Sequence, residues 1–174
     1  MKFVLIGFGV LGLLVAGVLV IGLLLPKRHV ATRSAVLRAT PEMLFALISG
    51  SQEWRPEVKT CELIDGISGQ HFQRETSRRG ETVLYELEGS RPPLAIERRI
   101  ATEGLPYGGK WSFRLEPVSG GASEETRVRI TEDGEVYNPV FRFVSRVVMG
   151  HTAMLDAYLK ALGKAVGQEA RIEN

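Results

Sequence analysis

The sequence predicts an α+β domain in which a curved antiparallel sheet wraps around a long C-terminal helix, with a transmembrane helix at the N-terminus. Three observations lead to this prediction. An uncharged apolar run opens the chain, six strand-like segments follow one another without a helix between them, and a long amphipathic segment comes last. Strands without intervening helices favour an antiparallel meander, and a sheet and a helix that are each apolar on one side pack together.

The apolar run covers residues 3–25 and contains no charged residue. As a helix it would be about 35 Å long at ~1.5 Å per residue, enough to cross a hydrocarbon core of ~30 Å. A cleaved signal peptide is the alternative, but its apolar region is normally ~7–15 residues long and ends at a small-residue cleavage site. Here LLLPKRH ends the run. We therefore expect residues 1–25 to form a transmembrane anchor and residues 26–31 to form a basic linker.

Basic residues cluster after the apolar run rather than before it. Only Lys2 precedes the run, and four basic residues follow it: Lys27, Arg28, Arg33 and Arg38. Positive charge favours the cytoplasmic side of a span, so we expect a single-pass membrane protein whose soluble domain lies in the cytoplasm. Gly9, Gly12 and Ala16 share one helix face, which leaves an oligomer formed through the span open.

Composition excludes several classes of function. The chain has 174 residues and a net charge of +2, which is too small to indicate nucleic-acid binding. Cys61 is the single cysteine, so no intrachain disulfide forms. The histidines lie far apart, at positions 29, 71 and 151, and form no local ligand motif. Glycine-rich nucleotide motifs and a nucleophile elbow are missing from the sequence, so we expect no metal and no cofactor.

The soluble part begins with a predicted strand at 30–39 and a short helix at 40–49. Thr40 is a suitable N-cap and Pro41 suits the first helical position. Six strand-like runs follow, separated by turn residues. These runs are 58–64, 71–78, 82–88, 94–102, 110–117 and 126–136.

The last segment has the most regular periodicity. Asn138 is expected to cap, and Pro139 to open, a helix that continues to about residue 166. Apolar residues recur along it at helical spacing, and charged residues fall mostly on the opposite side. At ~1.5 Å per residue the helix would be about 40 Å long and would cross a whole small domain. We therefore assign residues 32–168 to one domain and residues 169–174 to a tail.

Four motifs of the soluble part follow one another in a recognisable order. They are RATPEMLFALIS, Trp54 with Pro56, GGKWSFRLEP and TRVRITEDGEVYNPVFRF, within about residues 30–162. Together they resemble the START/polyketide-cyclase-like superfamily, also called SRPBCC, and most of all its membrane-anchored bacterial members. The resemblance implies a helix-grip fold with an apolar cavity between sheet and helix. It implies ligand binding more than one reaction, because the superfamily includes lipid carriers, cyclases and hydrolase activators.

Strand alternation and helical spacing predict which side chains face that cavity. Trp111 and Phe113 share one strand face, and Glu132 shares a face with Val128 and Ile130 next to the helix start. Ligand sites usually combine apolar walls with a few polar groups. The predicted lining consists of Tyr85, Trp111, Phe113, Glu132, Phe141, Val144 and Leu155.

Glu132 permits two interpretations. In the first, it lies at the sheet edge and pairs with an arginine such as Arg98 or Arg74, or accepts hydrogen bonds near the helix start. In the second, it lines the cavity, where loss of water raises its pKa, and it binds or protonates a ligand. The acidic residues on either side of Gly134 are expected to point outward or to lie in a turn around it. The stretch is too short for a calcium loop, which needs several spaced ligands.

Three functions follow from this reading. The first is membrane-tethered binding of a hydrophobic or amphipathic small molecule, such as a lipid, an isoprenoid or a polyketide-like compound. The second is a cyclase or hydrolase that uses Glu132, His151 or Tyr85 as acid or base. The third is a structural module whose groove is filled by side chains. No pattern places a nucleophile beside a base, so no catalytic residue is assigned. A measurable cavity would argue against the third function, and an acid–base pair inside it would favour the second.

Overall fold

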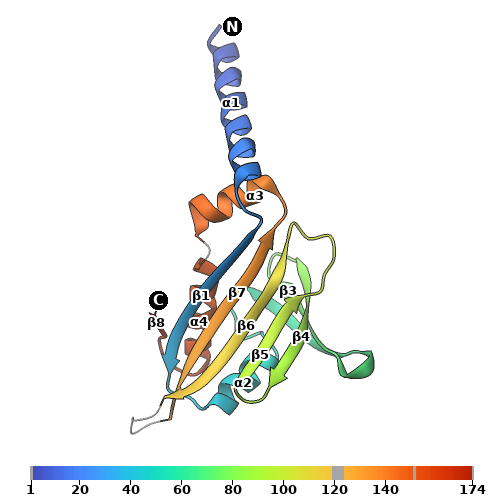
Figure 1. Cartoon of the computed structure of the whole chain (residues 1–174), viewed down its shortest axis with the longest axis vertical. Coiled ribbons are helices and arrows are strands. Elements are labelled where there is room, and N and C mark those ends of the chain that lie inside the picture. The colour runs from blue at the N-terminus through green and yellow to red at the C-terminus, as the bar shows by residue number, and fades with distance from the viewer. Residues whose placement is uncertain (1, 119–123, 151, 174) are drawn as a thin grey trace.

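The computed structural model describes residues 2–118, 124–150 and 152–173 (Figure 1). Its described part contains an eight-stranded sheet in the order β2-β3-β4-β5-β6-β7-β1-β8, and every neighbouring pair is antiparallel. The strands are β1 (Arg28–Leu37), β2 (Val58–Asp65), β3 (His71–Ser77), β4 (Thr82–Arg91), β5 (Ala95–Ile100), β6 (Tyr107–Val118), β7 (Glu125–Val136) and β8 (Arg171–Glu173). The predicted meander of six strands corresponds to β2 through β7.

The helices, in chain order, are α1 (Lys2–Leu24), α2 (Pro41–Ser49), the short 3-10 helix η1 (Ile67–Gly69), α3 (Pro139–Val144), the π-helix η2 (Ser145–Met149) and α4 (Ala153–Ala165). Two of them, α2 and α4, cover one face of the curved sheet, as the predicted α+β helix-grip fold requires. The core forms where α2 and α4 meet the inner face of the sheet. Leu44 and Ile48 of α2 and Leu159 of α4 pack there with Ile96 and Ile130 of the strands.

The two predicted helix starts are confirmed. The Thr40 hydroxyl accepts a hydrogen bond from the Met43 amide at 3.2 Å, and the Asn138 side-chain oxygen accepts one from the Phe141 amide at 3.1 Å. In each helix a proline follows the cap. Proline has no backbone N–H to satisfy and its φ suits the first turn of a helix, so the sequence marks both starts.

The predicted continuous helix from Pro139 to about residue 166 is wrong. The chain forms α3, widens into the π-helix η2, and breaks at Gly150 before α4 begins at Ala153. Gly150 has a φ of 72°, a left-handed conformation that glycine adopts at little cost and that ends a helix. Apolar residues continue at helical spacing on both sides of the break, so periodicity alone did not reveal it.

Two other boundaries differ from the prediction. β1 begins at Arg28, inside the segment 26–31 that was expected to be a linker. β8 lies within the expected tail at 169–174, where it pairs with β1. Of the two alternatives for the acidic residues beside Gly134, the turn does not form, because β7 runs through Gly134 to Val136, where the predicted strand 126–136 also ends, in continuous register with β6.

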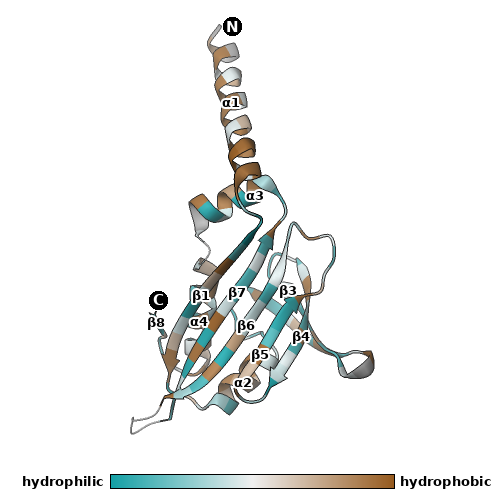
Figure 2. Ribbon diagram, in the orientation of Figure 1, coloured by the Kyte–Doolittle hydropathy of each residue, from teal (hydrophilic) through white to brown (hydrophobic). Residues whose placement is uncertain are grey.

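α1 projects from one end of the domain and is long and apolar enough to cross a membrane (Figures 1 and 2). Its base is packed against α3. Arg142 of α3 donates a hydrogen bond from Nη1 to the Leu25 carbonyl at 3.0 Å. Gly22 approaches α3 so closely that an added Cβ would lie 2.0 Å from the Pro139 carbonyl oxygen. The apolar helix is therefore attached to the domain by direct contacts.

A candidate ligand cavity between sheet and helices

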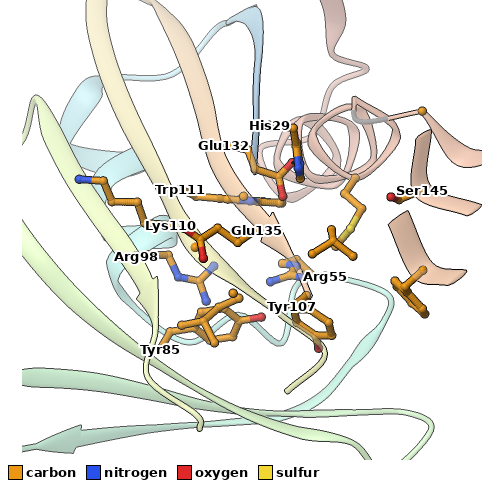
Figure 3. A pocket seen from close by; sticks show the side chains of 18 residues that line it. His29, Arg55, Tyr85, Arg98, Tyr107, Lys110, Trp111, Glu132, Glu135 and Ser145 are labelled. Carbon is orange, nitrogen blue, oxygen red and sulfur yellow. The ribbon is translucent and has the colours of Figure 1, made fainter. Parts of the chain in front are cut away.

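A cavity of about 320 Å³ lies between the inner face of the sheet and the segment that runs from α3 to α4 (Figure 3). Strands β1, β4, β5, β6 and β7 provide one wall. Phe141, Ser145, Gly150 and Met154 provide the opposite wall. Its volume is at the lower end of the ~300–1,000 Å³ that ligand sites occupy. The groove is therefore open at this end. This argues against the structural module considered above, whose groove would be filled by side chains.

The seven residues predicted to line the cavity divide into three groups. Tyr85, Trp111, Glu132 and Phe141 lie on its wall. Phe113 and Leu155 face the same space between sheet and helices but are packed into the core, with exposed fractions of 1% and 0%. Val144, at the end of α3, is partly buried and is not among the wall residues.

Strand register explains why the wall residues on neighbouring strands meet. Trp111 on β6 lies opposite Glu132 on β7 and opposite Arg98 on β5. Directly opposed residues of antiparallel strands share one face of the sheet. A row of three inward side chains, one acidic, one aromatic and one basic, therefore crosses the cavity wall.

A buried group of charges forms the floor of the cavity. Glu75 accepts a hydrogen bond from Arg55 Nη1 at 3.0 Å and a second from Arg98 Nη2. All three side chains are buried, and both arginines line the cavity. Arg55 also donates from Nε to the more exposed Glu57 at 2.8 Å. The buried group thus holds two guanidinium ions and one carboxylate, and the second carboxylate lies outside it.

Tyr85 stacks under the Arg98 guanidinium, whose central carbon lies 4.4 Å from the ring centroid. Burial raises the pKa of Tyr85 to about 12, with a smaller contribution from the Glu75 carboxylate. Its hydroxyl therefore remains protonated at neutral pH and can donate a hydrogen bond. A pKa so high does not suit the basic role considered for Tyr85.

Glu132 lies beside His29 rather than beside an arginine. The Glu132 carboxylate and His29 Nε2 are 3.6 Å apart, and both residues line the cavity. The predicted pairing of Glu132 with Arg98 or Arg74 is wrong, because Arg98 binds Glu75 and Arg74 binds Glu62 at 3.1 Å. The cavity wall therefore places a carboxylate and an imidazole next to each other, at a separation longer than a hydrogen bond.

Glycines at this end of the sheet permit close packing of the neighbouring strands and of the His29 ring. Gly109 of β6 lies opposite Gly134 of β7. An added Cβ at Gly109 would meet the Asp133 carbonyl oxygen at 2.2 Å, and its φ of 119° disfavours any other residue. An added Cβ at Gly134 would lie 2.5 Å from the His29 ring. The strands approach closely there, and the His29 imidazole occupies the space that a side chain at Gly134 would take.

Aromatic side chains close the other end of the cavity. The Tyr158 ring lies edge-on to Trp54 at 5.2 Å and to Trp111 at 5.5 Å, and it contacts Phe113 at 5.3 Å. Its hydroxyl donates to Gln52 Oε1 at 3.0 Å, and burial raises its pKa to about 12. Trp111 therefore separates the open cavity from a fully packed aromatic cluster.

Sequence reasoning missed most of the polar wall. His29 fell within the expected linker, and Arg55 lies in a connection without a periodic pattern. Arg98 had a signal, because two adjacent arginines in a strand place one of them inward. His151 lies outside the described residues. Within the described residues, no group of three histidine, cysteine or acidic side chains is arranged to hold a metal ion.

Comparison with known proteins agrees with this architecture. Residues 28–167 match the family model described as polyketide cyclase/dehydrase and lipid transport. No sequence among curated proteins matches the chain.

Solved structures share the fold at low sequence identity. The protein XoxI from Bacillus cereus is 19% identical with a TM-score of 0.59, covering 78% of this chain and 94% of that one. A START superfamily protein from Mycobacterium smegmatis is 17% identical with a TM-score of 0.58, covering 79% and 97%. Truncated norcoclaurine synthase from Thalictrum flavum is 15% identical with a TM-score of 0.58, covering 82% and 95%.

Proposed function

Because the chain belongs to the polyketide cyclase/dehydrase and lipid transport family, we propose that it binds an amphipathic small molecule in the cavity beside Trp111 while α1 holds it in a membrane. The family and its START-like neighbours support ligand binding in general. The membrane-tethered form and the class of ligand are inferred from the cavity and from α1.

The observation that carries the proposal is that Arg98 is buried on the cavity wall with an unsatisfied hydrogen-bond donor. Its side chain is 3% exposed, it lines the cavity, and its Nε has no hydrogen-bond partner among the described residues. A buried donor without a partner costs about 1–3 kcal/mol. A ligand oxygen would remove this cost, and because the unsatisfied donor belongs to a guanidinium ion, an anionic oxygen would bind it more strongly than a neutral one. We infer a ligand with an apolar body and a carboxylate or similar acceptor at one end.

A paired comparison of probes tests this ligand class. The full chain in mild detergent is titrated with a dansyl-labelled fatty acid and with the methyl ester of the same molecule. We expect the acid to bind about ten-fold more tightly, because only the acid is anionic. Trp111→Leu changes the cavity wall and should weaken the binding of both probes. Trp54→Leu is the control, because Trp54 lies on the far side of Tyr158 and belongs to the packed cluster, not to the wall. Equal binding of acid and ester would overturn the assigned polarity, and no binding of either would overturn the proposal.

Retention of α1 in the mature protein is supported by its packing. A cleaved signal peptide has no reason to complete the fold, yet the Arg142 guanidinium donates to the Leu25 carbonyl and Pro139 packs on Gly22. Mass spectrometry of the membrane fraction should detect peptides from residues 3–25. A soluble mature form that starts near Ala31 would contradict tethering.

Basic residues after α1 favour a cytoplasmic domain. Protease added to intact spheroplasts should then leave the domain uncut, and cleavage would reverse the orientation.

A second candidate is an enzyme in which Glu132, beside His29, acts as acid or base and transfers a proton to or from a bound substrate. Their separation of 3.6 Å inside the cavity favours it. Mass spectrometry of small molecules that co-purify with the full chain provides the test. Glu132→Gln should then accumulate a substrate that the parent protein converts. The same molecule, unchanged, on both proteins would exclude this chemistry.

A further inference from the structure

We propose that α3 and η2 rest on the surface of a lipid bilayer and that the cavity opens there, so that its ligand enters from the bilayer and not from water. This inference rests on the membrane tethering proposed above, and it adds the route by which the ligand reaches the site.

The contacts between α1 and α3 determine which part of the domain meets the membrane. Arg142 is 6% exposed and joins the two elements, with Nη1 on the Leu25 carbonyl and Nη2 on the Tyr137 carbonyl, each at 3.0 Å. α3 consequently lies across the base of α1 (Figure 1). When α1 spans a bilayer, its base lies at the interface, and α3 lies there with it.

The exposed side chains of α3 and η2 suit an interface. Val140, Phe141 and Val147 are 42%, 47% and 61% exposed, although nothing in the described protein covers them. Arg146 beside them and Lys27 at the base of α1 are also exposed. Apolar and basic side chains side by side are typical of segments that lie in the headgroup region, where basic groups attract anionic lipids. In the proposed arrangement the lipid surface therefore covers the apolar side chains of α3 and η2 that the domain leaves exposed.

The mouth of the cavity adjoins the same segment. Phe141, Gly150 and Met154 line the cavity and are also exposed, so they mark its opening, whereas Arg55 and Arg98 line it and are buried. The polar end of the cavity is therefore deep, and its apolar end is next to the proposed membrane surface. An amphipathic ligand can enter with its polar end first and keep its tail toward the bilayer throughout.

Fluorescence quenching tests the membrane contact without any ligand. Full-length protein carrying Cys61→Ser receives Val147→Cys or, as a matched control, Met43→Cys, which is similarly exposed on α2. Each variant is labelled with an environment-sensitive dye and reconstituted in vesicles of anionic lipid with brominated acyl chains. We expect quenching at position 147 to be at least about three-fold stronger than at position 43. Equal quenching at the two positions would overturn the proposal.

The route of entry is tested by a pair of charge insertions. Val140→Glu with Val147→Glu alters the proposed contact and leaves the cavity wall intact, and Met43→Glu with Ile67→Glu makes the same change on exposed residues away from α1. We expect only the first pair to slow uptake of the dansyl-labelled fatty acid from vesicles, about ten-fold, with unchanged affinity in detergent. Equal uptake rates for parent and variant would refute the route. Failure of the probe to bind in detergent would instead refute the proposed function, and the quenching result would still decide the membrane contact.

Discussion

The space between sheet and helices has a closed end and an open end. The two ends differ in the side chains that occupy their inward-facing positions. At the closed end Phe113, Leu155 and Tyr158 are at most 2% exposed and fill the space completely. At the open end the equivalent inward positions hold Gly109 and Gly134, the helix is broken at Gly150, and a cavity remains. The two ends therefore differ in the side chains at their inward positions and in the continuity of the helix that faces them, within one continuous sheet.

The largest expected effect is a difference in the free energy of unfolding between a substitution at the closed end and one at the open end. Phe113→Ala removes a fully buried ring and should lower the free energy of unfolding by about 3–5 kcal/mol. Phe141→Ala removes a ring that is 47% exposed at the open end, and it should cost about 0.5 kcal/mol or less. Chemical denaturation in detergent measures both. Similar losses would mean that the two ends are packed alike.

The floor of the open end should behave as a buried charge group and not as a surface pair. Glu75→Gln leaves Arg55 and Arg98 without their shared carboxylate and should cost about 3 kcal/mol. Glu62→Gln, which removes the exposed partner of Arg74, is the control and should change stability by less than about 0.5 kcal/mol. A stable Glu75→Gln variant would show that the floor does not need its carboxylate.

Filling the open end should affect binding more than folding. In Gly134→Ala the new methyl group must displace the His29 ring, which lies 2.5 Å from its position. We expect about ten-fold weaker binding of the dansyl-labelled fatty acid and a stability loss of about 1 kcal/mol. Thr131→Ala on the outer face of β7 is the control for both measurements. Unchanged binding in Gly134→Ala would place the ligand elsewhere.

The last prediction concerns the pH dependence of stability that Tyr85 and Tyr158 cause. This effect is the smallest at neutral pH and becomes large in alkali. The pKa of each is about 12 in the folded protein, above the ~10 of tyrosine in an unfolded chain. The folded state therefore retains protons that the unfolded state releases. Stability is unaffected below pH ~10 and falls as the pH rises toward 12. Ultraviolet titration should show two of the four tyrosines ionising only together with unfolding, and ionisation of all four in the intact fold near pH 10 would contradict the burial of Tyr85 and Tyr158.

Residue patterns predicted the elements well and the site only in part. Alternation placed Trp111, Phe113 and Glu132 on the inner face, since the side-chain period of a strand is fixed by its backbone. It could not distinguish Phe113, which packs in the core, from Trp111, which borders empty space. That distinction depends on what lies opposite, here Tyr158 and the break at Gly150. The partner of Glu132 depends on the register between β1 and β7, which pairs residues far apart in sequence.

The connection between α1 and β1 is short, and hydrogen bonds hold it to the domain, so it limits independent movement of the two elements. Only three residues separate Leu24 from Arg28, and they are held at both ends, since the Leu25 carbonyl accepts from Arg142 and the Lys27 carbonyl accepts from the Val136 amide at 2.8 Å. In the proposed membrane-tethered form, a tilt of α1 to match a thinner bilayer would therefore rotate the domain with it. The thickness of the surrounding lipid would then set the angle at which the cavity meets the headgroups.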